Sequence, residues 1–202
     1  LAQGRLASLA GLRSLEELDI FSSPKSIGIS EINRLSGLRE LRYLNIGMVV
    51  RDGATLNLTG LSRLETLRLL MAKSASFGDE DLACVAGMKN LKWLAISKMG
   101  GHCSVSDAGM VHLAGLTSLN RLWISGPGVT DRGLAEVANL RNLWDLGITG
   151  NFTDAGLRHI EGLTGLRRLT INSGKNLSPS AVAGLRKALP NANPFNVDKD
   201  RA

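Results

Sequence analysis

The stretch Ser106–Gly126, SDAGMVHLAGLTSLNRLWISG, is a unit that the rest of the chain repeats with variations. It opens on a hydroxyl and a carboxylate, Ser106 and Asp107, which favour the start of a helix. Apolar residues at helical spacing follow, Gly115 closes the helix, and spaced leucines then lead into a short strand. The strand leucine returns at steps of about 23 to 28 residues, the period of a solenoid repeat. Its copies are Leu18, Leu44, Leu67, Leu94, Leu122, Leu146 and Leu169.

Each strand segment closes with two apolar residues two positions apart, as in Leu122 and Ile124. Because strand side chains alternate, both point into the core and the residues between them point out. Such strands, each followed by a segment that crosses back, stack as parallel neighbours with right-handed crossovers. Strands lie about 4.8 Å apart whereas packed helices need about 8–10 Å. The stack must therefore curve into a short open arc, with a parallel sheet on the concave side and a mostly helical convex side.

Two parts of the chain depart from the repeat. The segment 48–59, MVVRDGATLNLT, has neither a cap nor a helical stripe, so we expect an extended or irregular return there. At the other end, Pro190 stops a last helix, and 192–197 then supplies a final edge strand. We expect 178–197 to be a C-terminal capping repeat and 198–202 to be a frayed tail. The chain opens in the middle of a repeat, which indicates a fragment of a longer protein.

The repeats resemble the leucine-rich-repeat superfamily, and more narrowly its bacterial type. The T-D-x-G-L helix start is carried best by residues 153–157, TDAGL, and the A-G-L strand start by 113–116, LAGL. The resemblance covers nearly the whole chain. It implies an α/β solenoid forming a single array over 1–202, with about seven strand-bearing repeats. It also implies a scaffold that binds other macromolecules, usually proteins, on its concave sheet.

Composition excludes several functional classes. The formal charge is +6, but no run of five or more like charges is present, which argues against a nucleic-acid-binding arm. No apolar segment is long enough to span a membrane. No secretion signal opens the chain, which excludes nothing because the chain opens in the middle of a repeat. Two cysteines, Cys84 and Cys103, are too few for a disulfide framework. Unpaired thiols fit a reducing compartment, which favours a cytoplasmic location.

Residues for catalysis or metal binding are not grouped in the sequence. His112 and His159 occupy equivalent helix positions in repeats that are not adjacent, and no zinc-ligand spacing is present. His102 and Cys103 would need outside ligands to hold a metal. We therefore expect no catalytic residues, no metal and no cofactor.

Aromatic residues give a stronger signal, because all three tryptophans and the one tyrosine fall on strand positions that face away from the core. Trp93, Trp123 and Trp144 come from three consecutive strands, within side-chain reach of one another. Large aromatics beside arginine are typical interface anchors. The predicted partner-binding residues are Tyr43, Arg68, Trp93, Arg121, Trp123, Trp144 and Asp145.

The leading hypothesis is a non-enzymatic module that recognises a protein partner through these residues. Acidic side chains on the first strand and Arg167 and Arg168 on the seventh would orient the partner. Four alternatives remain open. Stacked tryptophans can simply shield the sheet, or can bind carbohydrate rings. Binding of single-stranded nucleic acid suits stacking beside arginine, but acidic residues interrupt any basic track, and an enzyme is the last of the four.

Overall fold

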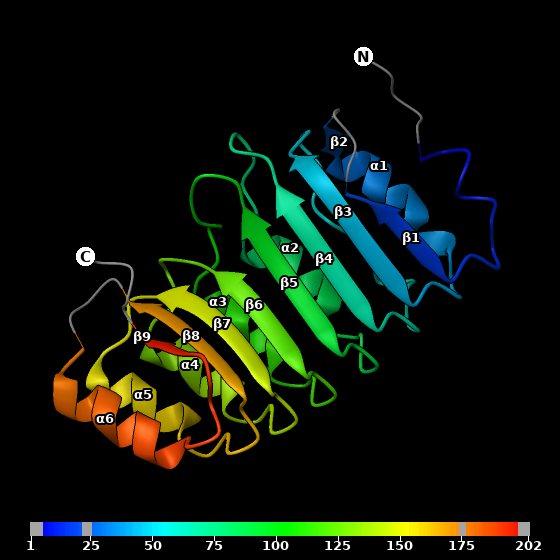
Figure 1. Ribbon diagram of the computed structural model, residues 1–202. Coiled ribbons are helices and arrows are strands. Elements are labelled where there is room, and N and C mark those ends of the chain that lie inside the picture. The colour runs from blue at the N-terminus through cyan, green and yellow to red at the C-terminus, as the bar shows by residue number, and fades with distance from the viewer. Residues whose placement is uncertain (1–5, 22–25, 174–176, 198–202) are drawn as a thin grey trace.

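One parallel sheet runs through the molecule (Figure 1). The computed structural model describes residues 6–21, 26–173 and 177–197; the expected frayed tail at 198–202 lies outside them. Within these ranges the sheet has nine strands, in the order β1-β3-β4-β5-β6-β7-β8-β9, with β2 paired to β3. The strands are β1 Glu17–Ile20, β2 Ile27–Gly28, β3 Tyr43–Val50, β4 Thr66–Met71, β5 Trp93–Lys98, β6 Arg121–Ser125, β7 Asp145–Gly150, β8 Arg168–Ser173 and β9 Phe195–Val197.

Strand alternation is as predicted. In β5, Leu94 and Ile96 are buried whereas Ala95 between them is half-buried on the opposite face. Leu94 pairs with Leu67 on one side and with Leu122 on the other, so the leucine side chains form a continuous row on the core-facing side of the sheet. Burying apolar surface in this row, at about 25 cal/mol per Å², is the main force that aligns the strands.

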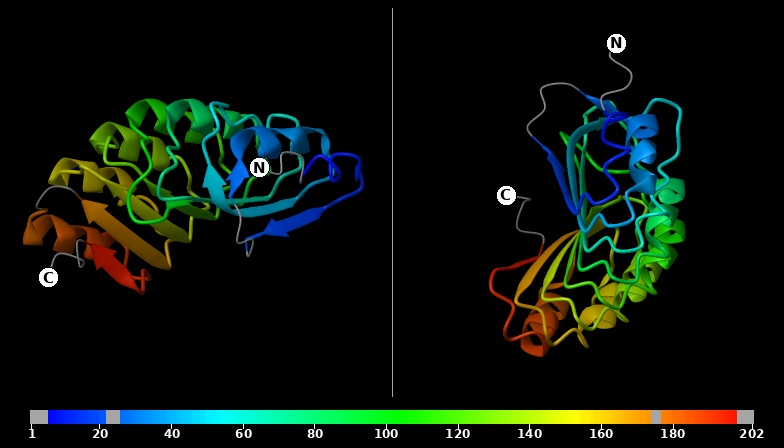
Figure 2. Two further views of the ribbon diagram at one scale, coloured as in Figure 1. Left: turned by 90° about the horizontal axis from the view of Figure 1, so that it is seen from above. Right: turned by 90° about the vertical axis from the view of Figure 1, so that its right-hand side faces the viewer.

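Helices cover the other face of the sheet, and the whole curves as predicted (Figure 2). The sheet lines the inner side of the arc and the helices line the outer side, which confirms the expected α/β architecture. Three of the crossovers end in a 3-10 turn, which suits a short connection. The helical segments are α1 Ile29–Asn33 with η1 Arg34–Gly37, α2 Asp79–Leu82 with η2 Ala83–Val85, α3 Asp107–Met110 with η3 Val111–Leu113, α4 Asp131–Val137, α5 Asp154–Ile160 and α6 Pro179–Ala188.

The second crossover is irregular, as expected, with no helix between residues 51 and 65. It is held by Asp81 of α2, a fully buried carboxylate. Asp81 accepts a hydrogen bond of 2.9 Å from the backbone N–H of Leu56 and forms an ion pair with Arg51. Asp81 occupies the position that Gly109, Gly133 and Gly156 take in the next three repeats. The acidic residue thus belongs to the repeat that follows the crossover without a helix.

Regular crossovers are tied to one another by an aspartate ladder, formed by Asp79, Asp107, Asp131 and Asp154. Asp107 illustrates it: Oδ1 accepts the backbone N–H of Thr130 at 2.7 Å and Oδ2 accepts the Thr130 hydroxyl at 2.6 Å. The same Thr130 oxygen accepts the N–H of Arg132 and caps α4. Each rung therefore joins the helix start of one repeat to that of the next.

The glycine of the T-D-x-G-L motif makes room for this ladder. Gly133 donates its N–H to Asp107 Oδ1 at 2.8 Å, and a Cβ at position 133 would lie only 2.5 Å from that oxygen. Gly109 and Gly156 are approached in the same way by Asp79 and Asp131. The motif thus encodes a contact between repeats. The hydroxyl residue of the motif donates hydrogen bonds to the aspartate of the preceding repeat, and the glycine leaves room for that aspartate.

The start of the first helix differs from the sequence-based expectation. The Ser30–Glu31 pair predicts a helix beginning there, whereas α1 begins at Ile29 with Gly28 as its N-cap and no side-chain cap. Ser30 instead donates its backbone N–H and its hydroxyl to Asp52 of the irregular crossover. The prediction was wrong because the serine bonds to the next repeat, not to its own helix.

The last helix and the final strand of the described residues form as predicted. Ser178 caps α6 by accepting the N–H of Ala181 at 3.1 Å, and the helix ends two residues before Pro190. The expected final strand is β9, which pairs with β8 and places Phe195 opposite Leu169. Phe195 is buried against the last layer of the core.

Replacing Asp107 with alanine removes the acceptor for three donors of the next repeat. Because half-buried N–H and hydroxyl groups then lack a partner, we expect Asp107→Ala to lower the free energy of unfolding by about 1–3 kcal/mol, measured by urea denaturation. The control is Glu80→Ala, which removes an exposed carboxylate of α2. Equal effects of the two substitutions would show that the ladder contributes nothing.

Acidic pH should weaken the aspartate ladder. Burial alone would raise the pKa of Asp107, but hydrogen bonds from Thr130 and Gly133 outweigh it and hold the pKa below its usual value. A lowered folded-state pKa gives stability that is complete above the unfolded value, about 3.9, and is lost as pH falls through the folded value. Urea midpoints should therefore decrease below about pH 4, and less steeply in Asp107→Ala. An identical acid dependence in both proteins would contradict this role.

Candidate functional site

The side chains of the concave face are set by the register of the strands. The row that begins at Tyr43 continues through Thr66 and Trp93 to Arg121, Asp145 and Arg168. The row two residues later contains Asn45, Arg68, Ala95, Trp123 and Gly147. Trp93 therefore neighbours Arg121 and not another tryptophan. The three indoles lie on the same face, but the Arg121 guanidinium stands between those of Trp93 and Trp144.

We call the resulting set Phe21, Arg68, Trp93, Arg121 and Trp144 the arginine–aromatic ladder. Arg121 Cζ lies 3.7 Å from the centroid of the Trp93 ring and 5.0 Å from that of Trp144. Arg68 Cζ lies 4.6 Å from the Trp93 ring and 5.9 Å from Phe21. Each guanidinium is thus placed between two aromatic rings, a favourable cation–π arrangement that fixes its orientation.

Phe21 was not among the predicted site residues. It follows β1 at a position two residues beyond Asp19, on the concave face, and 44% of its surface is exposed. The strand alternation that identified Trp93 and Trp123 would also have identified Phe21 if it had been extended one residue past Ile20.

Asp145 is predicted as a partner-binding residue, and the structure corrects this. It faces the concave side but is fully buried beneath three other side chains. Its carboxylate accepts the Nε1–H of Trp123 at 3.0 Å, and its second oxygen lies 3.3 Å from Arg121 Nε and 3.4 Å from Arg168 Nη1. Asp145 therefore positions the aromatic and basic side chains around it and has no surface of its own for a partner.

Trp123 lies across the neighbouring strand. A Cβ at Gly147 would come within 2.6 Å of two atoms of the Trp123 indole, so only glycine leaves room for the ring. The indole remains 36% exposed on its outer side. Gly147 and Asp145 together hold Trp123 flat on the sheet, with one edge bonded and one face open.

Tyr43 is not a member of the arginine–aromatic ladder. Its hydroxyl is 3.5 Å from Asp19 Oδ2, which also accepts the Asn45 amide at 3.0 Å. The Asn45 hydrogen bond, followed by that of the Phe21 N–H, lowers the pKa of Asp19 below its usual value. Tyr43 thus belongs to an acidic, hydrogen-bonded group at the first strands, and the tryptophans to a basic group further along.

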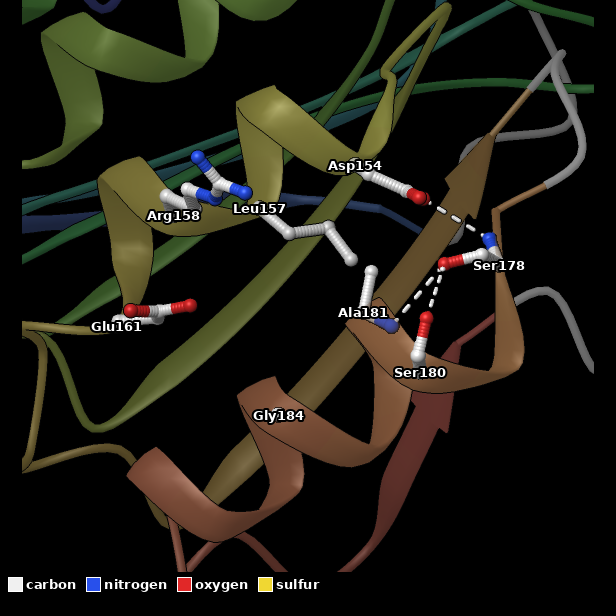
Figure 3. Close-up of a pocket in the computed structure, with 8 residues that line it drawn as sticks. All are labelled: Asp154, Leu157, Arg158, Glu161, Ser178, Ser180, Ala181 and Gly184. Carbon is white, nitrogen blue, oxygen red and sulfur yellow. Dashed lines mark hydrogen bonds between the residues drawn. The ribbon is translucent and has the colours of Figure 1, made fainter.

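A groove between two helices contains none of the predicted site residues. The groove between α5 and α6, about 280 Å³, is shown in Figure 3. Leu157 points across it toward Ala181, while Asp154 and Ser180 both bond Ser178 at the start of α6. The polar groups at that end serve the helix cap, and none of the predicted residues lines the groove.

The two cysteines are buried and unpaired, and burial raises the pKa of Cys84 to about 12 and of Cys103 to about 11. Within the described ranges, no three histidine, cysteine or acidic side chains come together as metal ligands do. None of the helices described there is long and apolar enough to cross a membrane.

Comparison with known proteins places this architecture. No protein-family profile and no curated protein matches the chain. Among solved structures, an internalin (inlF) from Listeria monocytogenes matches 96% of this chain and 50% of its own, with 20% identity and a TM-score of 0.66. The fold is a leucine-rich-repeat solenoid.

Two receptors have the same solenoid fold. The plant peptide hormone receptor RGFR1, solved in complex with RGF2, is 16% identical over 92% of this chain and 32% of its own, with a TM-score of 0.56. A TDR receptor is 19% identical over 85% of this chain and 32% of its own, with a TM-score of 0.51. The chain spans half or less of the length of all three proteins.

Removing Asp145 should destabilise the solenoid and loosen its concave surface. Asp145→Ala leaves Arg121, Arg168 and the indole N–H of Trp123 without their shared acceptor. Both guanidinium groups stay partly exposed to water, so we use the cost of unsatisfied donors, about 1–3 kcal/mol. We expect a loss of that order in the free energy of unfolding, together with a red shift of tryptophan emission. A variant as stable as the wild type would mean that Asp145 does not organise this surface.

Proposed function

We propose that this protein is a non-enzymatic binding module that recognises a protein partner on its concave sheet, through the arginine–aromatic ladder and Trp123. The observation that carries the proposal is the contiguity of these side chains, which alternate ring and guanidinium across β4, β5, β6 and the start of β7. Three of the rings keep a large exposed surface: Phe21, Trp123 and Trp144.

Tryptophan and arginine are the residue types that contribute most to protein interfaces. Here their conformations are fixed before a partner arrives, because each guanidinium lies between two rings. Pre-organised side chains lose little conformational freedom on binding. Arg68 also donates no hydrogen bond to the described residues, so its N–H groups are available to a partner.

Charge on the concave side supports a defined orientation of the partner. Glu17 and Asp19 lie exposed on β1, whereas Arg167 and Arg168 lie exposed at the start of β8. Between them, Glu65 accepts hydrogen bonds from Lys92 at 2.6 Å and Arg42 at 2.9 Å, so these three charges are paired with one another. A partner with basic residues at one end and acidic residues at the other would therefore be attracted in one orientation only.

The comparisons support the proposal at the level of the fold alone. The plant peptide hormone receptor RGFR1, which has the same solenoid fold, is solved in complex with RGF2, and this supports a binding role for the architecture. The T-D-x-G-L repeats further support the narrower proposal that the chain is of the bacterial leucine-rich-repeat type.

Carbohydrate is the second candidate ligand. One specific observation favours it: the outer face of Trp123 is open, and a flat indole on a sheet is a stacking surface for a sugar ring. The flanking guanidinium groups at Trp93 and Trp144 favour an acidic or aromatic protein surface instead.

A displayed random-peptide library, selected on the full chain, tests the proposal. We expect Trp144→Ala and Arg68→Ala to weaken selected peptides by roughly tenfold or more, with little change in the urea midpoint. The control is Val111→Ala, which truncates a 52% exposed apolar residue of η3 on the convex side.

Two results would overturn the proposal. One is that Val111→Ala reduces binding as much as the concave substitutions do. The other is that a glycan array, and no peptide, yields a ligand whose binding Trp123→Ala abolishes; that result would establish the carbohydrate alternative.

A further inference from the structure

A hollow of about 430 Å³ adjoins the arginine–aromatic ladder near the starts of the last strands. It is lined by Trp144 before β7, by Gly165 and Arg167 before β8, by Arg168 at the start of β8, and by Asn193 before β9. Trp144 belongs to both the ladder and the hollow. A segment bound along the ladder therefore reaches the hollow without a break.

The hollow has hydrogen-bond donors in excess. Arg167 is exposed, and its guanidinium makes no hydrogen bond or close ion pair with the described residues. Arg168 uses one donor for Asp145, at 3.4 Å, and 45% of its side chain stays exposed. None of the five lining residues is acidic.

The nearby negative charge does not satisfy these donors. Asp145 is completely covered and is shared between Arg168, Arg121 and the indole N–H of Trp123. Two arginines adjacent in sequence, one of them without a hydrogen-bond partner among the described residues, thus line a hollow that Trp144 and Asn193 also line. A planar carboxylate matches the guanidinium fork in two parallel hydrogen bonds, and methylene groups beside it fit the indole.

We propose that this hollow binds an acidic side chain, glutamate or aspartate, of the partner segment that lies on the ladder. The inference rests on the proposed function and adds the chemistry of the partner: an extended segment with an acidic residue next to the residue that contacts Trp144. Arg167 is the main ligand of that carboxylate, Arg168 and Asn193 add donors, and Gly165 contributes no side chain to the space.

The same displayed random-peptide library tests the inference. Peptides selected on the wild-type chain should be enriched in glutamate or aspartate, and replacing that residue with glutamine or asparagine should weaken binding roughly tenfold or more. Arg167→Gln should cause a similar loss, and Arg167→Glu should abolish the acidic preference. The matched control is Arg132→Gln, an exposed arginine on the convex helix α4. Amidated peptides separate a side-chain carboxylate from a C-terminal one, since only the latter loses affinity on amidation.

Each outcome has a distinct meaning. Peptides that need Trp144 but show no acidic preference would leave the proposed function standing and overturn this inference. The inference also fails if Arg132→Gln weakens acidic peptides as much as Arg167→Gln does, or if amidation removes the binding. A wild-type chain that selects no peptide at all would overturn both proposals.

Discussion

The alignment of the inward leucines is the constraint on which every other feature depends. From Leu44 to Leu169 the strand leucine of each repeat is fully buried and paired with its neighbours in the sheet. A shift of one residue would turn each of them toward solvent, so the register is strongly specified. That register also decides which outward side chains are neighbours. The arginine–aromatic ladder is therefore a consequence of how the core is packed.

On the convex side, the aspartate ladder maintains the same stacking by polar means. Asp107 and its equivalents join consecutive helix starts through the N–H and hydroxyl of the following repeat. The buried leucines and the hydrogen bonds between helix starts thus both hold consecutive repeats at the same spacing. Where one crossover lacks a helix, Asp81 and Arg51 supply a different link, and the sheet continues past it without interruption.

Much of this was readable from the sequence because the repeats report the same structure several times. The period placed the strand of each repeat, although it did not predict β2, and the missing cap and helical stripe identified the irregular return, which begins after β3. The residues after Pro190 predicted the final strand that contains Phe195. The sequence of a single repeat does not reveal contacts that form between two repeats of different length. The bond from Ser30 to Asp52 is of that kind, and it moved the start of α1.

The sequence predicted on which side of the sheet the candidate site lies, but it did not predict how deeply each of its side chains is buried. Alternation placed Trp93, Trp123 and Trp144 outward, yet it could not distinguish an exposed side chain from a covered one. Asp145 lies on the same face and is buried, because its three partners fold over it. Aligning the strand leucines would have shown Asp145 between Arg121 and Arg168, and a carboxylate between two arginines indicates an ion-paired residue.

Hydroxyl-radical footprinting of the chain, free and bound to a selected peptide, tests the central claim most directly. The claim is that binding occurs on the concave sheet. It predicts that the exposed side chains of Trp144 and Phe21 are oxidised in the free protein and protected in the complex, while Val111 on the convex side is oxidised equally in both. Protection of Val111 with unchanged oxidation of Trp144 would contradict it.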